Sequence, residues 1–110
     1  MLDKECIFAI VERGRAKRVI DSAKKVGASG ATVFYGRGTG ESEVQKFLNV
    51  HIESSKEIII LLSNQDEVRT IIKAMVDAGR LKEPGTGIVF SLPVSNLVGH
   101  KFREQFSDNV

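Results

Sequence analysis

The stretch "CIFAIVERGRAKRVIDSAKKVGASGATVFY", residues 6–35, decides the fold that the sequence predicts. Its first six residues form a continuous apolar run. Such a run is typical of a strand that is buried on both faces or lies in the centre of a sheet. Residues 31–35 are β-branched and aromatic, which indicates a second strand. Between the two strands the pattern changes to that of a helix.

The helical pattern covers residues 12–27, where apolar residues recur at helical spacing and lysines and arginines occupy the other positions. The apolar positions are Ala16, Val19, Ile20, Ala23 and Val26. Gly27 suits the C-terminus of this helix, and the two lysines before it suit the negative end of the helix dipole. Residues 6–35 therefore predict a strand, a helix and a strand.

The second half of the chain predicts a strand, a helix and a strand again. A β-rich segment runs from about Val50 to Leu62, and its polar residues 54–56 predict a bulge or bend. Ser63 or Asn64, followed by two acidic residues, is typical of a helix N-terminus. The apolar stripe of that helix is Val68, Ile71, Ile72, Met75 and Val76, and Ala78-Gly79 ends it. A final strand follows at 88–92.

This order of elements predicts a ferredoxin-like α+β fold, a βαββαβ sandwich. Two right-handed crossovers place both helices on one face of a four-stranded antiparallel sheet. No linker of low complexity divides the 110 residues, so a single domain over 1–110 is expected.

Composition and charge exclude several classes of protein. Sixteen basic and 14 acidic residues leave a formal net charge of +2, which gives no reason to expect nucleic acid as a partner. No run approaches the roughly 18 apolar residues of a membrane span, and the first residues lack the apolar core of a signal peptide. We therefore expect a cytoplasmic protein without direct membrane insertion. Cys6, the lone cysteine, is expected to be a small buried hydrophobe.

Two glycine clusters are the candidate functional segments. Gly36, Gly38 and Gly40 follow the second strand, and Gly85 and Gly87 precede the last. Glycine lets backbone N–H groups approach an anion, and the neighbouring cations Arg37, Arg80 and Lys82 could neutralise phosphates. Neither cluster is a Walker loop or a dinucleotide fingerprint. Spacing alone leaves ordinary turns and phosphate binding both open.

The remaining polar groups predict no chemistry of their own. His51, His100 and Cys6 match no metal-ligand spacing, so no metal site is expected. The acidic pairs Glu41/Glu43 and Asp66/Glu67 are expected to be a solvated loop and a helix start rather than a catalytic pair. The basic run at 13–25 is expected to be a solvated helix face.

The whole pattern resembles the PII nitrogen-regulatory signal-transduction family. The resemblance is carried by "AIVERGRAKRVIDSAKKVGASGATV", "GTG", "KEIIILL" and "AGRLKEPGTGIVFSLPVSNLV". It implies a homotrimer that binds adenine nucleotides in clefts between subunits and regulates a membrane transporter or a metabolic enzyme, without being an enzyme itself. It also implies a T-loop at about 37–50, a B-loop at about 80–88 and a C-terminal segment at 95–110.

The resemblance assigns roles to individual residues. Ile10 and Thr32 would lie near the adenine, and Leu62 would border it. Gly38, Thr39 and Gly40 would begin the T-loop beside the phosphates, and the B-loop amides of Gly85, Thr86 and Gly87 would receive phosphate oxygens. With the nearby cations, the candidate nucleotide-binding residues are Ile10, Thr32, Arg37, Gly38, Thr39, Gly40, Leu62, Lys82, Gly85, Thr86, Gly87, Lys101 and Arg103.

The chain departs from the family pattern at charged positions. Ile88 stands where the family has a lysine after the B-loop, and Gly99 and Lys101 stand where it has two arginines. Each missing charge-assisted contact would remove on the order of 1.5–3 kcal/mol unless another cation substitutes. We therefore expect ADP or AMP as readily as ATP, with magnesium accompanying a triphosphate and held mainly by its oxygens. The short T-loop also lacks the tyrosine that some members have modified by uridylylation.

Two other classes share this topology. One is a trimer of the divalent-cation-tolerance type, metal-handling or purely structural, which would be indifferent to nucleotides. The other is a small hydrolase of acylphosphatase type, whose arginine-containing loop the sequence does not display in recognisable form.

Overall fold

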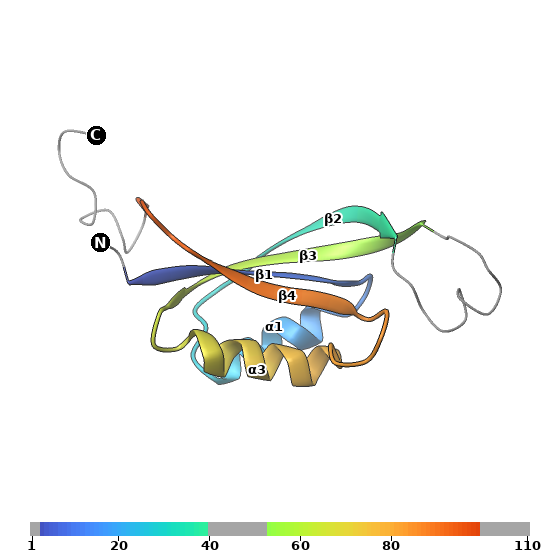
Figure 1. Cartoon of the computed structure of the whole chain (residues 1–110), viewed down its shortest axis with the longest axis horizontal. Helices are drawn as coiled ribbons and strands as arrows, with labels where there is room; N and C mark the ends of the chain where they lie inside the picture. The colour runs from blue at the N-terminus through green and yellow to red at the C-terminus, as the bar shows by residue number, and fades with distance from the viewer. Residues whose placement is uncertain (1–2, 40–52, 100–110) are drawn as a thin grey trace.

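A computed structural model gives the protein's structure and describes residues 3–39 and 53–99. The strands and helices follow one another in the predicted order (Figure 1). The elements are β1 (Lys4–Glu12), α1 (Ala16–Lys25), β2 (Thr32–Thr39), β3 (Glu53–Asn64), α3 (Val68–Gly79) and β4 (Gly87–Pro93).

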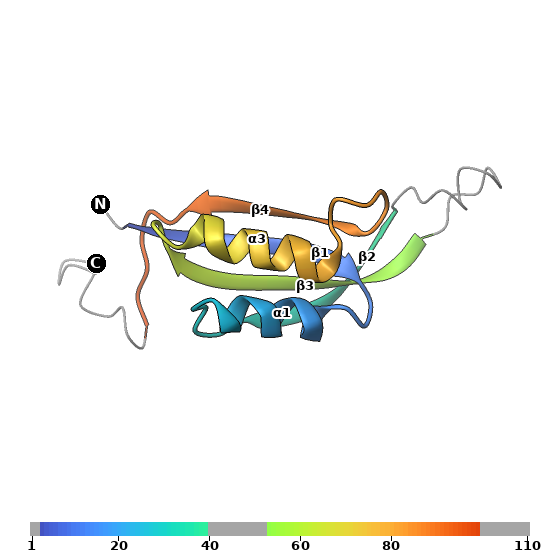
Figure 2. The same ribbon diagram turned by 90° about the horizontal axis from the view of Figure 1, so that it is seen from below.

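The four strands form one sheet in the order β2-β3-β1-β4, and every neighbouring pair is antiparallel. Each strand-helix-strand unit therefore leaves one strand of the other unit between its own two strands. Both helices lie on the same face of the sheet, as Figures 1 and 2 show from two directions. The ferredoxin-like α+β fold predicted from the sequence is confirmed.

β1 is central, and its side chains alternate between two different environments. Ile7, Ala9 and Val11 face the helices and are fully buried, whereas the residues between them are half-buried on the other face. The prediction of a central strand is therefore right, and burial on both faces is wrong. A period of two with one covered face is what antiparallel sheets commonly show.

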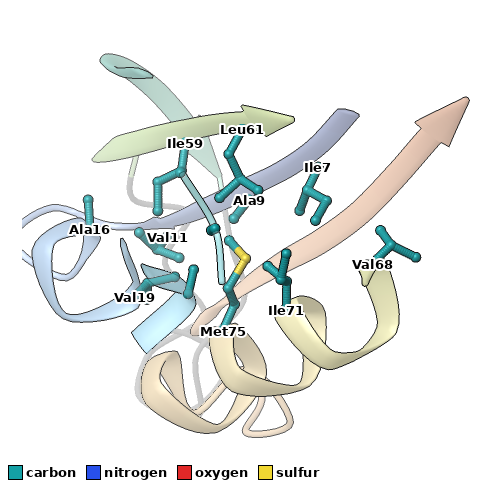
Figure 3. Close-up of a cluster of buried hydrophobic side chains, with 12 residues drawn as sticks. Ile7, Ala9, Val11, Ala16, Val19, Ile59, Leu61, Val68, Ile71 and Met75 are labelled. Carbon is teal, nitrogen blue, oxygen red and sulfur yellow. The ribbon is translucent and has the colours of Figure 1, made fainter. Parts of the chain in front are cut away.

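The core fills the space between the sheet and the two helices (Figure 3). Ile59 and Leu61 of β3 meet Val19 of α1 and Ile71 and Met75 of α3, and none of the five exceeds 2% exposure. Burial of such a side chain stabilises the fold by about 1.5–3 kcal/mol relative to leaving it in water. The helical spacing read from the sequence thus identified the residues that hold α1 and α3 to the sheet.

α1 is stabilised at both ends by features of different origin. Its N-cap Arg15 makes no side-chain capping bond; instead, Glu57 of β3 accepts hydrogen bonds from Gly14 N and from Ala16 N, the latter at 3.3 Å. A carboxylate at this end is favoured by the helix dipole. At the other end Gly27 has φ +116°, as its predicted role requires. The prediction that Val26 belongs to the apolar stripe of this helix is wrong, because Val26 follows the last helical residue and is 39% exposed.

The predicted capping of α3 by Ser63 or Asn64 is wrong. Both residues belong to β3, because its pairing with β1 continues to the Lys4–Asn64 pair. The helix begins at Val68 after Glu67, which makes no side-chain capping bond. Strand pairing provides these residues with partners that a sequence pattern does not reveal.

The predicted bulge at residues 54–56 is also wrong, because β3 runs through them without interruption. Gly36 pairs with Lys56, Arg37 with Ser55, and the pairing continues through Gly38 to Thr39. β1 ends opposite Lys56. β2 and β3 therefore continue beyond the four-stranded sheet as a two-stranded ribbon (Figure 1).

Candidate functional site

The sheet face turned away from the helices, which we call the open face, is largely apolar. Phe34, Ile88, Phe90 and Leu92 are each between 41% and 55% exposed there, and Phe90 stacks on Phe8 with ring centroids 5.3 Å apart. Cross-strand pairing places ten apolar side chains on this face: Cys6, Phe8, Ile10, Phe34, Ile58, Ile60, Leu62, Ile88, Phe90 and Leu92.

Three candidate nucleotide contacts lie on the open face. Ile10 sits in its middle, between Ile58 and Ile88, and Thr32 pairs with Ile60. Leu62 lies nearer the start of β1, opposite Cys6. Within one chain these residues share a face but do not form one compact cluster.

Leu62 also lines a cavity of about 300 Å³ at the start of β1. The cavity lies between the α1–β2 connection, at Ala28, and the end of β3, at Ser63. The hydroxyl of Ser63 donates to the Asn64 carbonyl oxygen at 2.9 Å, so this buried polar group has a partner. The candidate base-bordering residue therefore adjoins a cavity with polar groups on its wall.

Gly36 and Gly38 of the first glycine cluster lie in a strand instead of a turn. β2 continues through Thr39, and neither Gly36 nor Gly38 has a positive φ, so these residues form no nest of amides. A Cβ on Gly36 would come within 2.7 Å of Ile58 Cδ1, and one on Gly38 within 3.7 Å of Lys56 Cγ. The glycines leave room for side chains of β3 that lean across them.

The second cluster lies in the loop between α3 and β4, where glycine is required by the backbone. Gly85 has φ +78° and Gly87 has φ +146°. A Cβ on Gly87 would lie 2.2 Å from the carbonyl oxygen of Ile10, closer than any Cβ can come. Gly87 thus allows the loop to join the sheet directly beside the backbone of β1.

The loop before Gly87 is held by its own polar groups. The Thr86 hydroxyl lies 3.0 Å from the Arg80 carbonyl oxygen and 2.9 Å from that of Glu83, and donates between them. Arg80 adopts the left-handed conformation at the end of α3, and its Nε lies 3.2 Å from Glu83 Oε1. The Thr86 side chain therefore fixes the shape of the loop.

The two glycine segments lie at the same end of the sheet but at its opposite edges. Gly87 pairs with Val11, Val11 with Glu57, and Glu57 with Tyr35, the neighbour of Gly36. Three strand spacings of about 4.8 Å separate them, roughly 14 Å in total. One chain cannot close both segments on the same phosphate group.

An ion pair that the sequence did not indicate lies between these edges. Lys56 Nζ is 2.7 Å from Glu12 Oε1, and the two residues are cross-strand partners on the open face. Their side chains are 11% and 37% exposed. The pair joins residues 44 positions apart, so no local pattern could have found it.

Arg37 and Lys82, the predicted phosphate-binding cations in the described part of the chain, do not lie on the open face. Arg37 is exposed and alternates with Gly36 and Gly38, so it belongs to the face that carries the helices. Arg13 lies over the Tyr35 ring on that same face, 5.8 Å from its centroid. Lys82 is exposed in the loop. Gly40, Lys101 and Arg103 lie outside the described residues, as do the side chain of Thr39 and most of the predicted T-loop.

A local ion pair and partial burial shift the pKa values of three groups in the described part of the chain. The hydrogen bond from Lys17, 2.9 Å long, lowers the pKa of Asp21 and raises that of Lys17 itself. Burial raises the pKa of Cys6, which lies half-buried on the open face.

Residues 3–39 and 53–99 contain no group of three potential metal ligands; His51 and His100, like Glu41 and Glu43, lie outside those ranges. Neither described helix is long and apolar enough to cross a membrane.

Comparison with known proteins places this arrangement among nitrogen-regulatory proteins. A family model described as "Nitrogen regulatory protein P-II" matches residues 4–104. A curated Arabidopsis thaliana protein described as "Nitrogen regulatory protein P-II homolog" is 28% identical over 98 residues. That match covers 84% of this chain and 50% of the relative, so the chain spans about half the length of the curated protein it matches.

A solved structure agrees in fold and sequence. The crystal structure of Arabidopsis thaliana PII bound to citrate superposes with a TM-score of 0.63 at 26% sequence identity. The superposition covers 86% of this chain and 79% of that one.

Proposed function

This chain belongs to the nitrogen regulatory protein P-II family, and from that premise we propose that it is a homotrimeric regulator that binds an adenine nucleotide between its subunits. The observation that carries the proposal is the placement of Gly38 and Gly87. They lie at one end of the sheet but at opposite edges, so a phosphate-binding site made from both requires a second copy of the chain.

The open face supports association into a trimer. Four large apolar side chains are about half exposed on it, together with the stacked Phe8–Phe90 pair. Contiguous apolar surface of this kind marks an interaction site in soluble proteins. Covering it with the same face of neighbouring subunits would bring one subunit's β2 edge towards the next subunit's β4 edge.

The described residues fit a nucleotide in part. Gly85 and Gly87 have the positive φ values expected of a glycine loop that approaches an anion, and Ile10, Thr32 and Leu62 offer contacts on the open face. Ile88 occupies the position of the family's lysine, and its apolar side chain is 55% exposed on the same face. The site therefore has fewer charges than the family pattern, which favours ADP or AMP as much as ATP.

The ligand class extends to other compact polyanions. The related Arabidopsis thaliana PII was solved bound to citrate, a small molecule with three carboxylates. A site made of backbone amides and few cations can accept a carboxylate as well as a phosphate. Citrate therefore belongs among the ligands to test here, and magnesium is needed only to accompany a triphosphate.

Regulation would follow from the coupling of the ligand to the predicted T-loop. A bound anion can shift a loop only by binding one of its states more tightly than the other. The predicted T-loop, at about 37–50, would begin within the described end of the β2–β3 ribbon, which includes Gly38. We place this protein in the cytoplasm, as a regulator of a membrane transporter or a metabolic enzyme and not as an enzyme itself.

Calorimetric titration of the full chain with ATP, ADP, AMP and citrate tests the proposal, with and without magnesium. We expect saturable binding of at least one adenine nucleotide and a subunit stoichiometry near one. Native mass spectrometry of the same samples should show a trimer. Absence of binding by all three nucleotides at millimolar concentration would refute the nucleotide assignment, and a single-chain mass would refute the shared site.

A further inference from the structure

Lys56 is a cation of the open face to which the nucleotide contacts named above assign no role. The residue is only 9% exposed even in a single chain, and Glu12 is its ion-pair partner at 2.7 Å. Lysine is rarely buried to this degree unless it is paired. Its position therefore holds a positive charge at a fixed point of the face.

The β2 side of Lys56 carries no side chains. Its cross-strand partner is Gly36, and the missing Cβ of Gly38 would lie 3.7 Å from Lys56 Cγ and 3.8 Å from its Cε. On the β1 side stands Glu12, whose side chain is the more exposed of the pair. A ligand that approaches over the two glycines would thus meet no side chain of Gly36 or Gly38, only the β3 side chains that lean across them, Ile58 and Lys56 itself.

The ammonium of Lys56 also has unused capacity. It carries three N–H donors, and within the described part of the chain Glu12 Oε1 is its acceptor. A phosphate oxygen can share the ammonium with Glu12 or replace it. The Glu12 carboxylate and a phosphate at the same ammonium would repel each other, so the two would compete for Lys56.

The register places this charge in the proposed nucleotide site. Glu12 follows Val11, the partner of Gly87, and Lys56 faces Gly36 across the β2–β3 pair. Lys56 therefore lies at the same end of the sheet as both glycine segments, in the strand next to β2 and two strands from β4.

We propose that Lys56 binds the phosphates of the nucleotide and that Glu12 competes with those phosphates for the same ammonium. This inference rests on the proposed function. Lys56 would supply part of the charge that is lost where Ile88 replaces the family's lysine. Glu12 would select ligands with more than one phosphate, because a single phosphate displaces a carboxylate less effectively.

The test is titration of the full chain with ADP, comparing the unaltered protein with Lys56→Gln, Glu12→Gln and the double variant. Loss of a charge-assisted phosphate contact should weaken ADP binding about tenfold or more in Lys56→Gln. Glu12→Gln should bind ADP several-fold more tightly, on the order of 3- to 10-fold, because the competitor is gone. In the Lys56→Gln background the Glu12→Gln change should have no further effect.

Asp21→Asn provides the matched control. It also removes a carboxylate from a lysine, in the exposed Lys17–Asp21 pair, and so changes the net charge equally. Its ADP affinity should stay within about twofold of the unaltered protein, since exposed charges are screened. If Glu12→Gln also tightened ADP binding in the Lys56→Gln background, the gain would come from the lower negative charge of the protein in general. That result would overturn the proposed competition for Lys56.

The outcomes separate this inference from the function on which it rests. If the unaltered chain binds no nucleotide, both fail. If it binds ADP and Lys56→Gln binds equally well, only the role of Lys56 fails. Circular dichroism checks each variant, and should Lys56→Gln not fold, Glu12→Gln alone decides: unchanged or weaker ADP binding overturns the proposal.

Discussion

Gly87 lies so close to β1 that no larger residue fits without moving the backbone. The obstacle to an added Cβ is the Ile10 carbonyl oxygen at 2.2 Å, and φ is +146°. By contrast, the obstacle at Gly36 is the end of the flexible Ile58 side chain. The two glycine clusters look alike in sequence and answer different physical requirements.

Replacement of Gly87 by alanine should therefore be costly. We expect Gly87→Ala to destabilise the fold by about 2–4 kcal/mol, since left-handed strain and displacement of β1 add together. Gly30→Ala is the matched control: no atom lies within 4 Å of its added Cβ, so its effect should stay below about 1 kcal/mol. Urea unfolding measures both, and equal midpoints would contradict the close approach at Gly87.

Ile88→Lys should strengthen binding of the more highly charged nucleotide. The change places an ammonium on the open face directly after Gly87, where Ile88 is 55% exposed and can be replaced without opening the core. One added charge-assisted contact predicts about tenfold tighter ATP binding and a smaller gain for AMP. Calorimetry of both ligands is the measurement; an equal gain for both would show that the new lysine does not reach the terminal phosphates.

At the scale of elements, α1 depends on a residue from another strand. Glu57 is 9% exposed and accepts hydrogen bonds from the backbone amides of Gly14 and Ala16. It stands directly before the apolar run of β3 at residues 58–62, opposite Val11. Burial of a carboxylate there has a desolvation free energy that the two amide hydrogen bonds and the helix dipole offset.

Removal of that carboxylate should weaken the helix and the fold together. Glu57→Ala leaves the buried N–H of Ala16 and the partly buried N–H of Gly14 without their acceptor and should cost about 2–3 kcal/mol. Glu57→Gln keeps an acceptor and should cost less. Glu83→Gln, which touches only the exposed pair with Arg80, should change stability by under about 1 kcal/mol. Thermal unfolding compares the three; a Glu57→Ala variant as stable as Glu83→Gln would refute the role.

The elements also show where sequence reasoning succeeds. Helical spacing identified Val19, Ile71 and Met75 as core, because one covered face imposes a period that local sequence must follow. It failed at Ser63 and Asn64, whose capping chemistry is overridden by pairing with β1. It failed likewise for the Glu12–Lys56 pair, because contacts between distant segments have no local signature.

At the candidate site, too, the sequence-based expectations agree with the structure at some residues and differ from it at others. The family motif located Gly85 and Gly87, whose positive φ values agree with a specialised loop. It gave Gly38 as a residue beside the phosphates, and the glycine spacing suggested Arg37 as a neighbouring cation, but strand alternation puts the Arg37 side chain on the opposite face. A strand through Thr39 could not be foreseen, because glycine has low strand propensity and pairing with β3 decides the matter.

At the scale of the whole molecule, the open face should govern association. Phe90→Glu places a charge among apolar residues and beside Phe8, so we expect it to shift the protein from the proposed trimer towards the single 12.1 kDa chain. Val26→Glu, an equally polar change at an exposed residue beyond α1, should leave the trimer intact. Sedimentation velocity decides, and a Phe90→Glu variant with unaltered mass would exclude the open face as the interface.

A half-exposed apolar sheet has a thermodynamic consequence for the cell as well. If folding is completed only when three copies meet, dilution lowers the melting temperature by mass action. Newly made subunits would then be short-lived until enough of them accumulate. The abundance of the protein would rise steeply once synthesis passes a threshold, so the amount of regulator would itself respond as a switch.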